Sequence, residues 1–203
     1  MTALPFLHLN LRRNPFGELT VHERTALAVV EVSTALRHLA LPRSAVQVVG
    51  EKGFGKTTHL LAMATHFSHS AYVHIPEGER VAISAIGEPL LIDEAQRLTL
   101  LQRWQIFRSE RRLILGTHTD FEDALCRAGR TVLTIAANQF TNASSVHTLL
   151  NARVQSARRA DGPVPSITTH TASGLFAEFG PDIRSIEHSM YHTFQQLRNI
   201  QDV

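Results

Sequence analysis

Residues Gly50-Glu51-Lys52-Gly53-Phe54-Gly55-Lys56-Thr57 follow the pattern G-x-x-x-x-G-K-T. The preceding run, Ala45-Val46-Gln47-Val48-Val49, is short and rich in β-branched residues, which predicts a buried strand. The following residues, 58–67, predict a helix. A glycine-rich loop between a strand and a helix is the setting in which this pattern forms a binding site, so the rest of the chain is interpreted outward from it.

The residue types in this loop suit a bound phosphate group. Glycine tolerates the backbone shapes that turn successive amide groups inward, and the dipole of the following helix also favours an anion. Lys56 would reach the β- and γ-phosphates, and the Thr57 hydroxyl would take one Mg²⁺ position. The chain has 20 lysines and arginines, of which only Lys52 and Lys56 are lysines, so a lysine in the required place is not background composition. The expected nucleotide-binding residues are Gly50, Gly53, Phe54, Gly55, Lys56, Thr57 and Thr58.

Composition limits the class of protein. A chain of 203 residues can form one good core and a small appended subdomain. Cys126 is the single cysteine, which excludes an internal disulfide framework and fits a reducing compartment. No apolar run approaches the roughly 20 residues of a membrane span. We therefore expect a soluble cytoplasmic protein. The formal charge of +2 is too weak to argue for nucleic acid, although Arg153, Arg158 and Arg159 form a basic cluster that could contact DNA.

The order of the expected elements predicts an α/β fold. Near-continuous apolar runs at 71–75, 89–94, 112–117 and 131–135 alternate with helical patterns, which favours a five-stranded parallel sheet flanked by helices. Thr20-Val21-His22-Glu23 is a capping box, and a helix to about His38 should follow it. The stretch at 161–165 breaks the chain. We expect an α/β domain over 1–160 and a small C-terminal helical lid over 161–203.

A second candidate site is the acidic pair Asp93–Glu94 at the end of a buried strand. Ligands of parallel sheets bind at the carboxyl ends of strands, so this pair should face the glycine loop. Asp93 can hold Mg²⁺ as a hard oxygen ligand. Glu94 can orient and deprotonate an attacking water. The alternative is a strand-end acid that caps the next helix.

These stretches together resemble the motifs of AAA+ ATPases. Gly50–Thr57 is similar to Walker A, Leu90–Gln96 to Walker B and Leu113–Thr117 to the sensor-1 strand. The nearest similarity is to bacterial secretion and transposition ATPases of the ExeA and TniB type, in which an Asn-Pro-Phe segment, here Asn14-Pro15-Phe16, lies near the adenine.

The resemblance implies further roles. Asn14 and Phe16 would lie near the base, Thr117 would sense the γ-phosphate, and Arg184 would reach it from the lid. Arg127 or Arg130 would act as an arginine finger on a neighbouring subunit. Each of these side chains could instead be an ordinary strand-end or surface residue.

The resulting expectation is a P-loop NTPase that binds ATP and Mg²⁺, hydrolyses ATP and forms ATP-dependent homo-oligomers. The segment before the acidic strand is too short for a helix and a pore loop, which favours a switch acting on a protein partner over an unfoldase. One alternative is an ATP-dependent assembly module without significant hydrolysis. A small-molecule P-loop kinase is a third, disfavoured by the acid beside Asp93.

Overall fold

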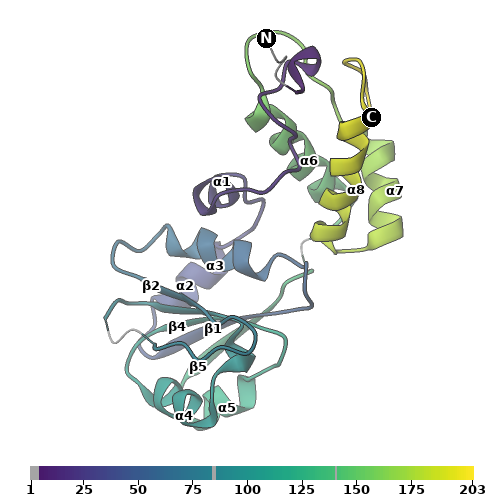
Figure 1. Ribbon diagram of the computed structural model, residues 1–203. Coiled ribbons are helices and arrows are strands. Elements are labelled where there is room, and N and C mark those ends of the chain that lie inside the picture. Colours follow the sequence, from purple (N-terminus) through teal and green to yellow (C-terminus); the bar gives the residue numbers. More distant parts are fainter. Residues whose placement is uncertain (1–4, 84–85, 140) are drawn as a thin grey trace. The chain divides into compact units, whose positions relative to one another are not determined.

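The computed structural model describes residues 5–83, 86–139 and 141–203. It forms two compact units, one of residues Val30–Gln139 and one that joins Met1–Val29 to Phe140–Val203 (Figure 1). This division differs from the expected boundary after residue 160. Helix α6 (Ala143–Ala157), expected in the sheet domain, packs against α7 (Thr169–Phe179) and therefore belongs to the helical unit.

The unit of residues 30–139 contains a five-stranded sheet in which every pairing is parallel, as expected. The strand order is β2-β3-β4-β1-β5. The strand that precedes the glycine loop is therefore separated from the acidic strand by β4. The strands are β1 (Ser44–Val49), β2 (Ala71–His74), β3 (Leu90–Asp93), β4 (Leu113–Thr117) and β5 (Thr131–Ala136).

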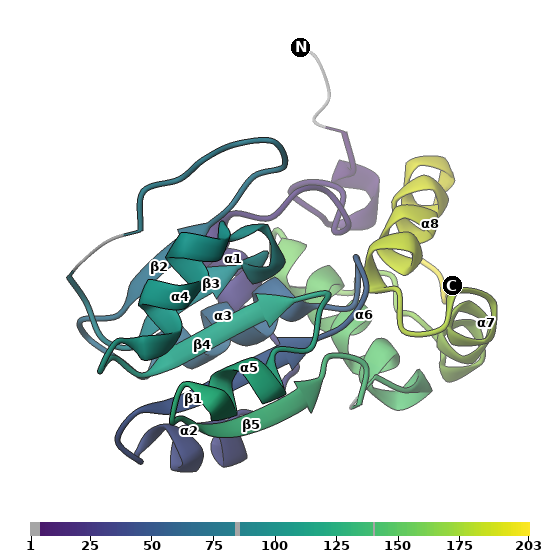
Figure 2. The same cartoon turned by 90° about the horizontal axis from the view of Figure 1, so that it is seen from below.

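Alternate strand residues face two apolar layers, one on each side of the sheet. Helices cover both faces of the sheet (Figures 1 and 2). On one side, Val46 and Val48 pack with helix α3 (Lys56–Ala64) and helix α2 (Ser33–Leu39). On the other, Leu113 and Leu115 pack with helix α4 (Leu100–Arg108) and helix α5 (Glu122–Arg127).

The chain leaves the neighbouring strands β1 and β4 toward opposite faces, to α3 and to α5 respectively. Such a switch point, at the carboxyl ends of adjacent parallel strands, is where open α/β sheets bind ligands.

The helix expected from Thr20 to about His38 is two helices. The capping box of Thr20 and Glu23 starts α1 (Val21–Ala26) as expected, but residues 28–32 are not helical before α2 begins. Val29, Val30 and Val32 lie in this interruption, and β-branched residues lose side-chain freedom in a helix. The two compact units divide within the same stretch.

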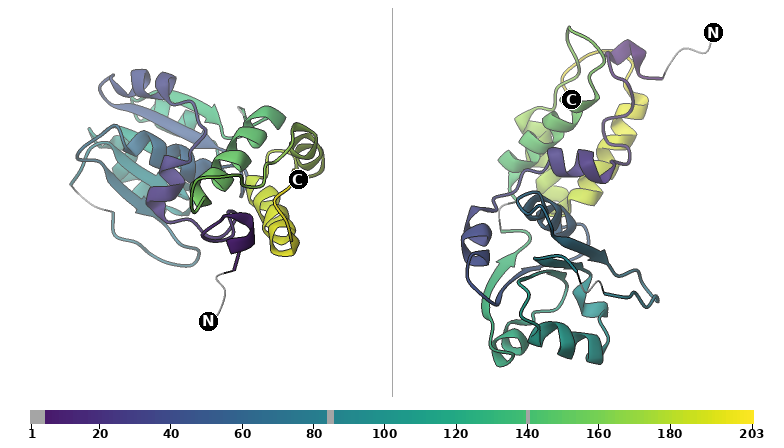
Figure 3. Two further views of the ribbon diagram at one scale, coloured as in Figure 1. Left: turned by 90° about the horizontal axis from the view of Figure 1, so that it is seen from above. Right: turned by 90° about the vertical axis from the view of Figure 1, so that its left-hand side faces the viewer.

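The helical unit has its own core, formed by α6, α7 and α8 (Ile183–Gln196) (Figure 3). The N-terminal segment, with the short helix η1 (Leu7–Leu9), runs along these helices, and Leu9 and Leu11 are buried there. Helix α8 buries one apolar stripe in this core, formed by Ile186, Met190 and Phe194. Within the described parts of the chain, no helix is both long and apolar enough to cross a membrane.

Arg153, one of the three arginines considered for contact with DNA, is buried among these helices. Its guanidinium donates to Pro15 O at 2.8 Å, Gly17 O at 2.8 Å and Glu187 at 2.7 Å. The basic cluster considered for DNA is therefore left without Arg153.

Candidate functional site

The glycine loop joins β1 to α3, and its glycines take up shapes that other residues avoid. Gly53 has φ 93° and Gly55 has φ 83°, both in the left-handed region. An added Cβ at Gly55 would meet no atom within 4 Å, so the requirement there is conformational rather than steric. At Gly50 the requirement is space, because a Cβ would lie 2.8 Å from Cβ of Ala137.

Lys56 is buried and folds back over its own loop. Its Nζ donates to Gly50 O at 2.9 Å and to Glu51 O at 3.0 Å, and lies 3.3 Å from Nε2 of His118. The ammonium group is therefore held within the loop, beside the tip of β4. It is the position from which a lysine can bind phosphate oxygens.

Helix α3 begins directly at Lys56, and its N-cap residue is Gly55, which offers no side-chain acceptor to the first turn. The first amides of a helix lack partners within the helix and carry the positive end of its dipole. Thr57 and Thr58 lie in this turn, which suits an anion. The Phe54 side chain packs against the apolar layer that contains α2 and α3, and its amide donates to Glu51 O at 3.3 Å.

The carboxylate of Asp93 is the centre of the site and is 1% exposed. The Thr57 hydroxyl donates to its Oδ2 at 2.7 Å, the Tyr72 hydroxyl donates to the same oxygen at 3.1 Å, and Nδ1 of His74 lies 3.4 Å from it. The two expected Mg²⁺ ligands, Thr57 and Asp93, are thus side by side. Both offer oxygen atoms, which Mg²⁺ prefers, so the donor set fits that ion.

Gly116 in β4 makes room for this carboxylate. A Cβ on Gly116 would lie 2.8 Å from Oδ1 of Asp93 and 3.3 Å from a methyl of Leu60. The close approach explains why a glycine stands inside a buried strand.

Glu94 directly follows Asp93 and has a left-handed backbone conformation, with φ 62°. Its Oε2 accepts from Nε2 of Gln96 at 2.6 Å and lies 3.5 Å from both Arg97 and His118. Burial raises the pKa of Glu94, but the Gln96 hydrogen bond and the nearby positive charges outweigh it, so the pKa lies below its usual value. The carboxylate is therefore kept in the ionised form that a general base requires.

His118 was not expected from the sequence, yet it links the two halves of the site. Its ring lies between Lys56 of the loop and Glu94 of the acidic strand, and its amide donates to Oε1 of Gln96 at 3.3 Å. His118 can be recognised only from the strand order. Because β4 lies between β1 and β3, the carboxyl end of β4 lies next to both the glycine loop and Glu94.

Thr117, the expected sensor, is fully buried and shapes the turn at the end of β4. Its Oγ1 donates to Thr119 O and accepts from Thr119 N, both at 2.9 Å, and its carbonyl accepts from Gly50 N at 3.1 Å. The hydroxyl is thus used in the turn, and the residue that faces the loop and Glu94 is the next one along.

The two candidate finger arginines differ sharply. Arg127, at the end of α5, is exposed. Arg130 is 4% exposed, and burial lowers its pKa to about 10. Its guanidinium donates to backbone carbonyls of six residues, so a role on another subunit is wrong for it. These carbonyls belong to Arg43, Ser44, Ile106, Phe107, Ser109 and Arg111.

Asn14 and Phe16, expected near adenine, are part of the helical unit's core. Nδ2 of Asn14 donates to Tyr191 O at 3.0 Å, and its Oδ1 accepts from Phe16 N at 3.0 Å. The Phe16 ring packs edge-on against Phe194, with 5.1 Å between centroids. Both side chains are therefore used in packing. Arg184 lies exposed in the first turn of α8.

Comparison with models of known protein families found no match, and a search of curated proteins found none either. The functional interpretation therefore depends on the geometry of residues 50–58, 72–74, 93–97 and 116–118.

Proposed function

We propose that this chain is an ATP-binding and ATP-hydrolysing switch of the AAA+ type that passes its nucleotide state to a protein partner. The observation that carries the proposal is the 2.7 Å hydrogen bond from the Thr57 hydroxyl to Asp93. It joins a helix that starts at a glycine loop to the tip of the acidic strand. Nucleotide hydrolysis needs a loop that can bind phosphate beside a carboxylate that can bind Mg²⁺.

Each residue has a distinct part in this proposal. Lys56 and the first amides of α3 bind the phosphates, and Thr57 and Asp93 hold Mg²⁺. An ion held by these two residues would supply charge neutralisation at the phosphates. Glu94 accepts the proton of the attacking water, and His118 positions Glu94 relative to Lys56. A base with a depressed pKa stays ionised at neutral pH, which supports this assignment of Glu94.

The decisive experiment compares single substitutions in the full chain. Glu94→Gln should keep ATP affinity while turnover falls about 10²- to 10⁴-fold, the usual contribution of a positioned base. Lys56→Ala should abolish ATP binding. Lys52→Ala is the matched control, because Lys52 is the other lysine and is exposed. Equal turnover in Glu94→Gln and wild type would remove Glu94 as the base, and ATP binding unaffected by Lys56→Ala would end the proposal.

One observation favours a second candidate, an assembly module that binds ATP without significant hydrolysis. Oε2 of Glu94 is already engaged by Gln96 and lies near Arg97 and His118. A carboxylate held in this way could remain turned from the water. Phosphate release and gel filtration, each with and without ATP, separate the two: assembly on ATP without phosphate release favours the module.

A further inference from the structure

Helix α4 presents an apolar face away from the core. Leu100 is 82% exposed, Leu101 64% and Trp104 58%. With 3.6 residues per turn these three side chains fall on one side of the helix together with Arg108 and Gln105, which are also exposed. Single exposed apolar residues are ordinary, but a contiguous group on one helix marks an interaction site. We call these five residues the α4 outer face.

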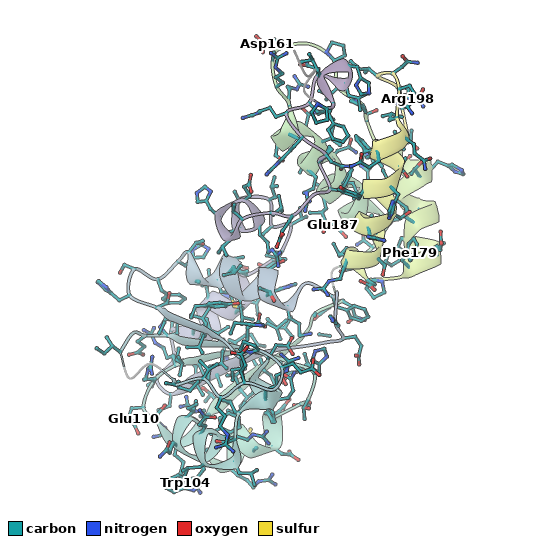
Figure 4. The ribbon with its side chains drawn as sticks, in the orientation of Figure 1. Trp104, Glu110, Asp161, Phe179, Glu187 and Arg198 are labelled. Carbon is teal, nitrogen blue, oxygen red and sulfur yellow. The ribbon has the colours of Figure 1, made fainter. Side chains whose placement is uncertain are left out.

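The opposite side of α4 packs against the sheet. Ile106 and Phe107 are buried in the layer that covers the sheet, and the capping box of Thr99 and Gln102 fixes the start of the helix. Trp104 lies at the outside of the helix (Figure 4). The guanidinium of Arg108 lies 5.0 Å from the centroid of its ring. The outer face therefore contributes little to the core.

The charge of this region selects the partner. Between Ala95 and Ser109 the chain has three arginines and no acidic residue, and the acid that follows, Glu110, pairs with Arg43. Two of the three are engaged by other side chains, since Arg97 pairs with Glu94 and Glu77 and Arg103 lies over the Phe121 ring. Arg108 is the one that is exposed beside the apolar group. The face thus complements a segment with apolar side chains and carboxylates.

A protein segment fits these features better than other macromolecules. Nucleic acid is bound by several cations that follow the phosphates, and only Arg108 is offered here. A membrane surface is bound by several basic residues beside the apolar ones, and the outer face again offers only Arg108. Three neighbouring apolar anchors on one helix are typical of helix-to-helix recognition.

The same helix is connected to the proposed catalytic base. The short helix η2 (Ala95–Arg97) joins Glu94 to α4, and Arg103 donates to Gln96 O at 3.4 Å. Gln96 in turn holds Glu94 through Nε2 at 2.6 Å. Contacts within α4 and η2 thus connect the helix that carries the outer face to the residues that orient Glu94.

We propose that the α4 outer face docks an acidic amphipathic segment of a protein partner, and that docking changes hydrolysis by moving Gln96 and Glu94. The docking part of this proposal depends only on the α4 outer face. The regulatory part, a change in hydrolysis, rests on the proposed function.

Docking can be measured directly because Trp104 is the only tryptophan of the chain. The probes are two tryptophan-free helical peptides with leucines at i, i+3, i+4 and i+7, one flanked by glutamates and the other by lysines. Titrated into the nucleotide-free full chain, the acidic peptide should shift Trp104 emission to the blue and saturate. The basic peptide should bind about tenfold more weakly, and Arg108→Glu should reverse the preference.

Two matched variants give the control. Leu101→Ser should abolish the acidic peptide's saturable shift, whereas Leu41→Ser, at an exposed leucine outside the face, should leave it unchanged. Docking is overturned if the acidic peptide gives no saturable shift. It is also overturned if phosphatidylserine vesicles or duplex DNA shift Trp104 more strongly than that peptide, or if a second copy of the chain covers the face, seen as self-association abolished by Leu101→Ser.

The regulatory half is tested by phosphate release with and without saturating acidic peptide. A change in rate of about threefold or more that is absent in Leu101→Ser supports it, in line with typical coupling between sites. An unchanged rate with bound peptide overturns the coupling while docking stands. If no ATP is hydrolysed either with or without the peptide, both the proposed ATPase activity and the coupling are overturned. Docking is then still decided by the fluorescence titration.

Discussion

The backbone of Glu94 adopts a left-handed conformation that costs a non-glycine residue about 1–2 kcal/mol. It is held by its neighbours: its amide donates to Oδ1 of Asp93 at 3.2 Å and its carboxylate accepts from Gln96. Such strain gathers at functional sites because the surrounding structure fixes the direction of a side chain. At this residue the direction is toward His118 and the loop.

His118 is expected to act on turnover more than on binding. His118→Ala removes the ring that lies 3.3 Å from Nζ of Lys56 and 3.5 Å from Oε2 of Glu94. We expect kcat to fall about tenfold or more while the ATP dissociation constant changes little, with partial recovery in His118→Gln. Single-turnover and equilibrium-binding measurements separate the two constants, and His66→Ala, an exposed histidine after α3, is the control. An equal loss of affinity would make His118 a binding residue.

Arg130 and Arg127 make a matched pair for stability. Arg130→Met leaves buried carbonyls of Phe107, Ser109 and Arg111 without their donor, which should cost about 2–4 kcal/mol of unfolding free energy. Arg127→Ala, at an exposed site three residues earlier, should stay within about 0.5 kcal/mol. Urea denaturation measures both. A stable Arg130→Met protein would contradict the structural role, and the role of a finger on another subunit remains a prediction for Arg127 alone.

Motif residues of the candidate site could be predicted, but the residues that orient them could not. Lys56, Thr57 and Asp93 stand in patterns whose chemistry is local to a loop or a strand end. His118, Tyr72 and Gly116 matter because β4 lies between β1 and β3 and β2 lies beside β3. The sequence indicates that five strands exist, yet apolar strands of similar composition carry no signal of which ones are neighbours.

At the scale of elements, one glycine in β4 leaves room for the Asp93 side chain of the neighbouring strand β3. Gly116→Ala should place a Cβ 2.8 Å from Oδ1 of Asp93, displacing the carboxylate and costing about 1–3 kcal/mol of stability. We expect Mg²⁺-dependent ATP binding to weaken in parallel. Gly174→Ala in α7 is the matched control, because its Cβ would meet nothing within 4 Å and alanine suits a helix better than glycine. Titrations with ATP at varied Mg²⁺ would contradict this if Gly116→Ala behaved as Gly174→Ala.

Helix boundaries were less predictable than the strands. The capping box fixed the start of α1, since it depends on side chains only three residues apart. The position at which that helix ends depends instead on tertiary packing, because the two compact units divide between Val29 and Val30. Val29 and Val32 suit the stripe of a single helix, but both lie in the non-helical stretch between α1 and α2. Val29 is 41% exposed, whereas Leu39 in α2 is fully buried against the sheet.

At the scale of the whole molecule, the helical unit is discontinuous in sequence. Residues before β1 pack with residues after β5: Arg12 N donates to Ala157 O, and His8 Nε2 lies 2.9 Å from Leu197 O. A boundary inferred from the Pro- and Gly-containing stretch at 161–165 misses this, because such residues mark a turn whether or not a unit ends there. The N-terminal segment packs against residues that are far from it in sequence, and no short stretch of sequence indicates such a contact.

The two units allow a test of where the nucleotide acts. Binding to the native state alone stabilises it, by about 2.7 kcal/mol at a ligand concentration of 100 times the dissociation constant. ATP with Mg²⁺ should therefore slow amide hydrogen exchange first at residues 50–59, 93–97 and 116–118. Lys56→Ala should remove the effect, and EDTA should reduce it, because Thr57 and Asp93 are the proposed ligands of the ion. Arg184 gives the second half of the test: if it reaches the γ-phosphate, exchange at the start of α8 slows with ATP and not with ADP. Protection of α8 that is equal with both nucleotides would deny Arg184 that role, and protection absent from residues 50–59 would contradict the nucleotide site itself.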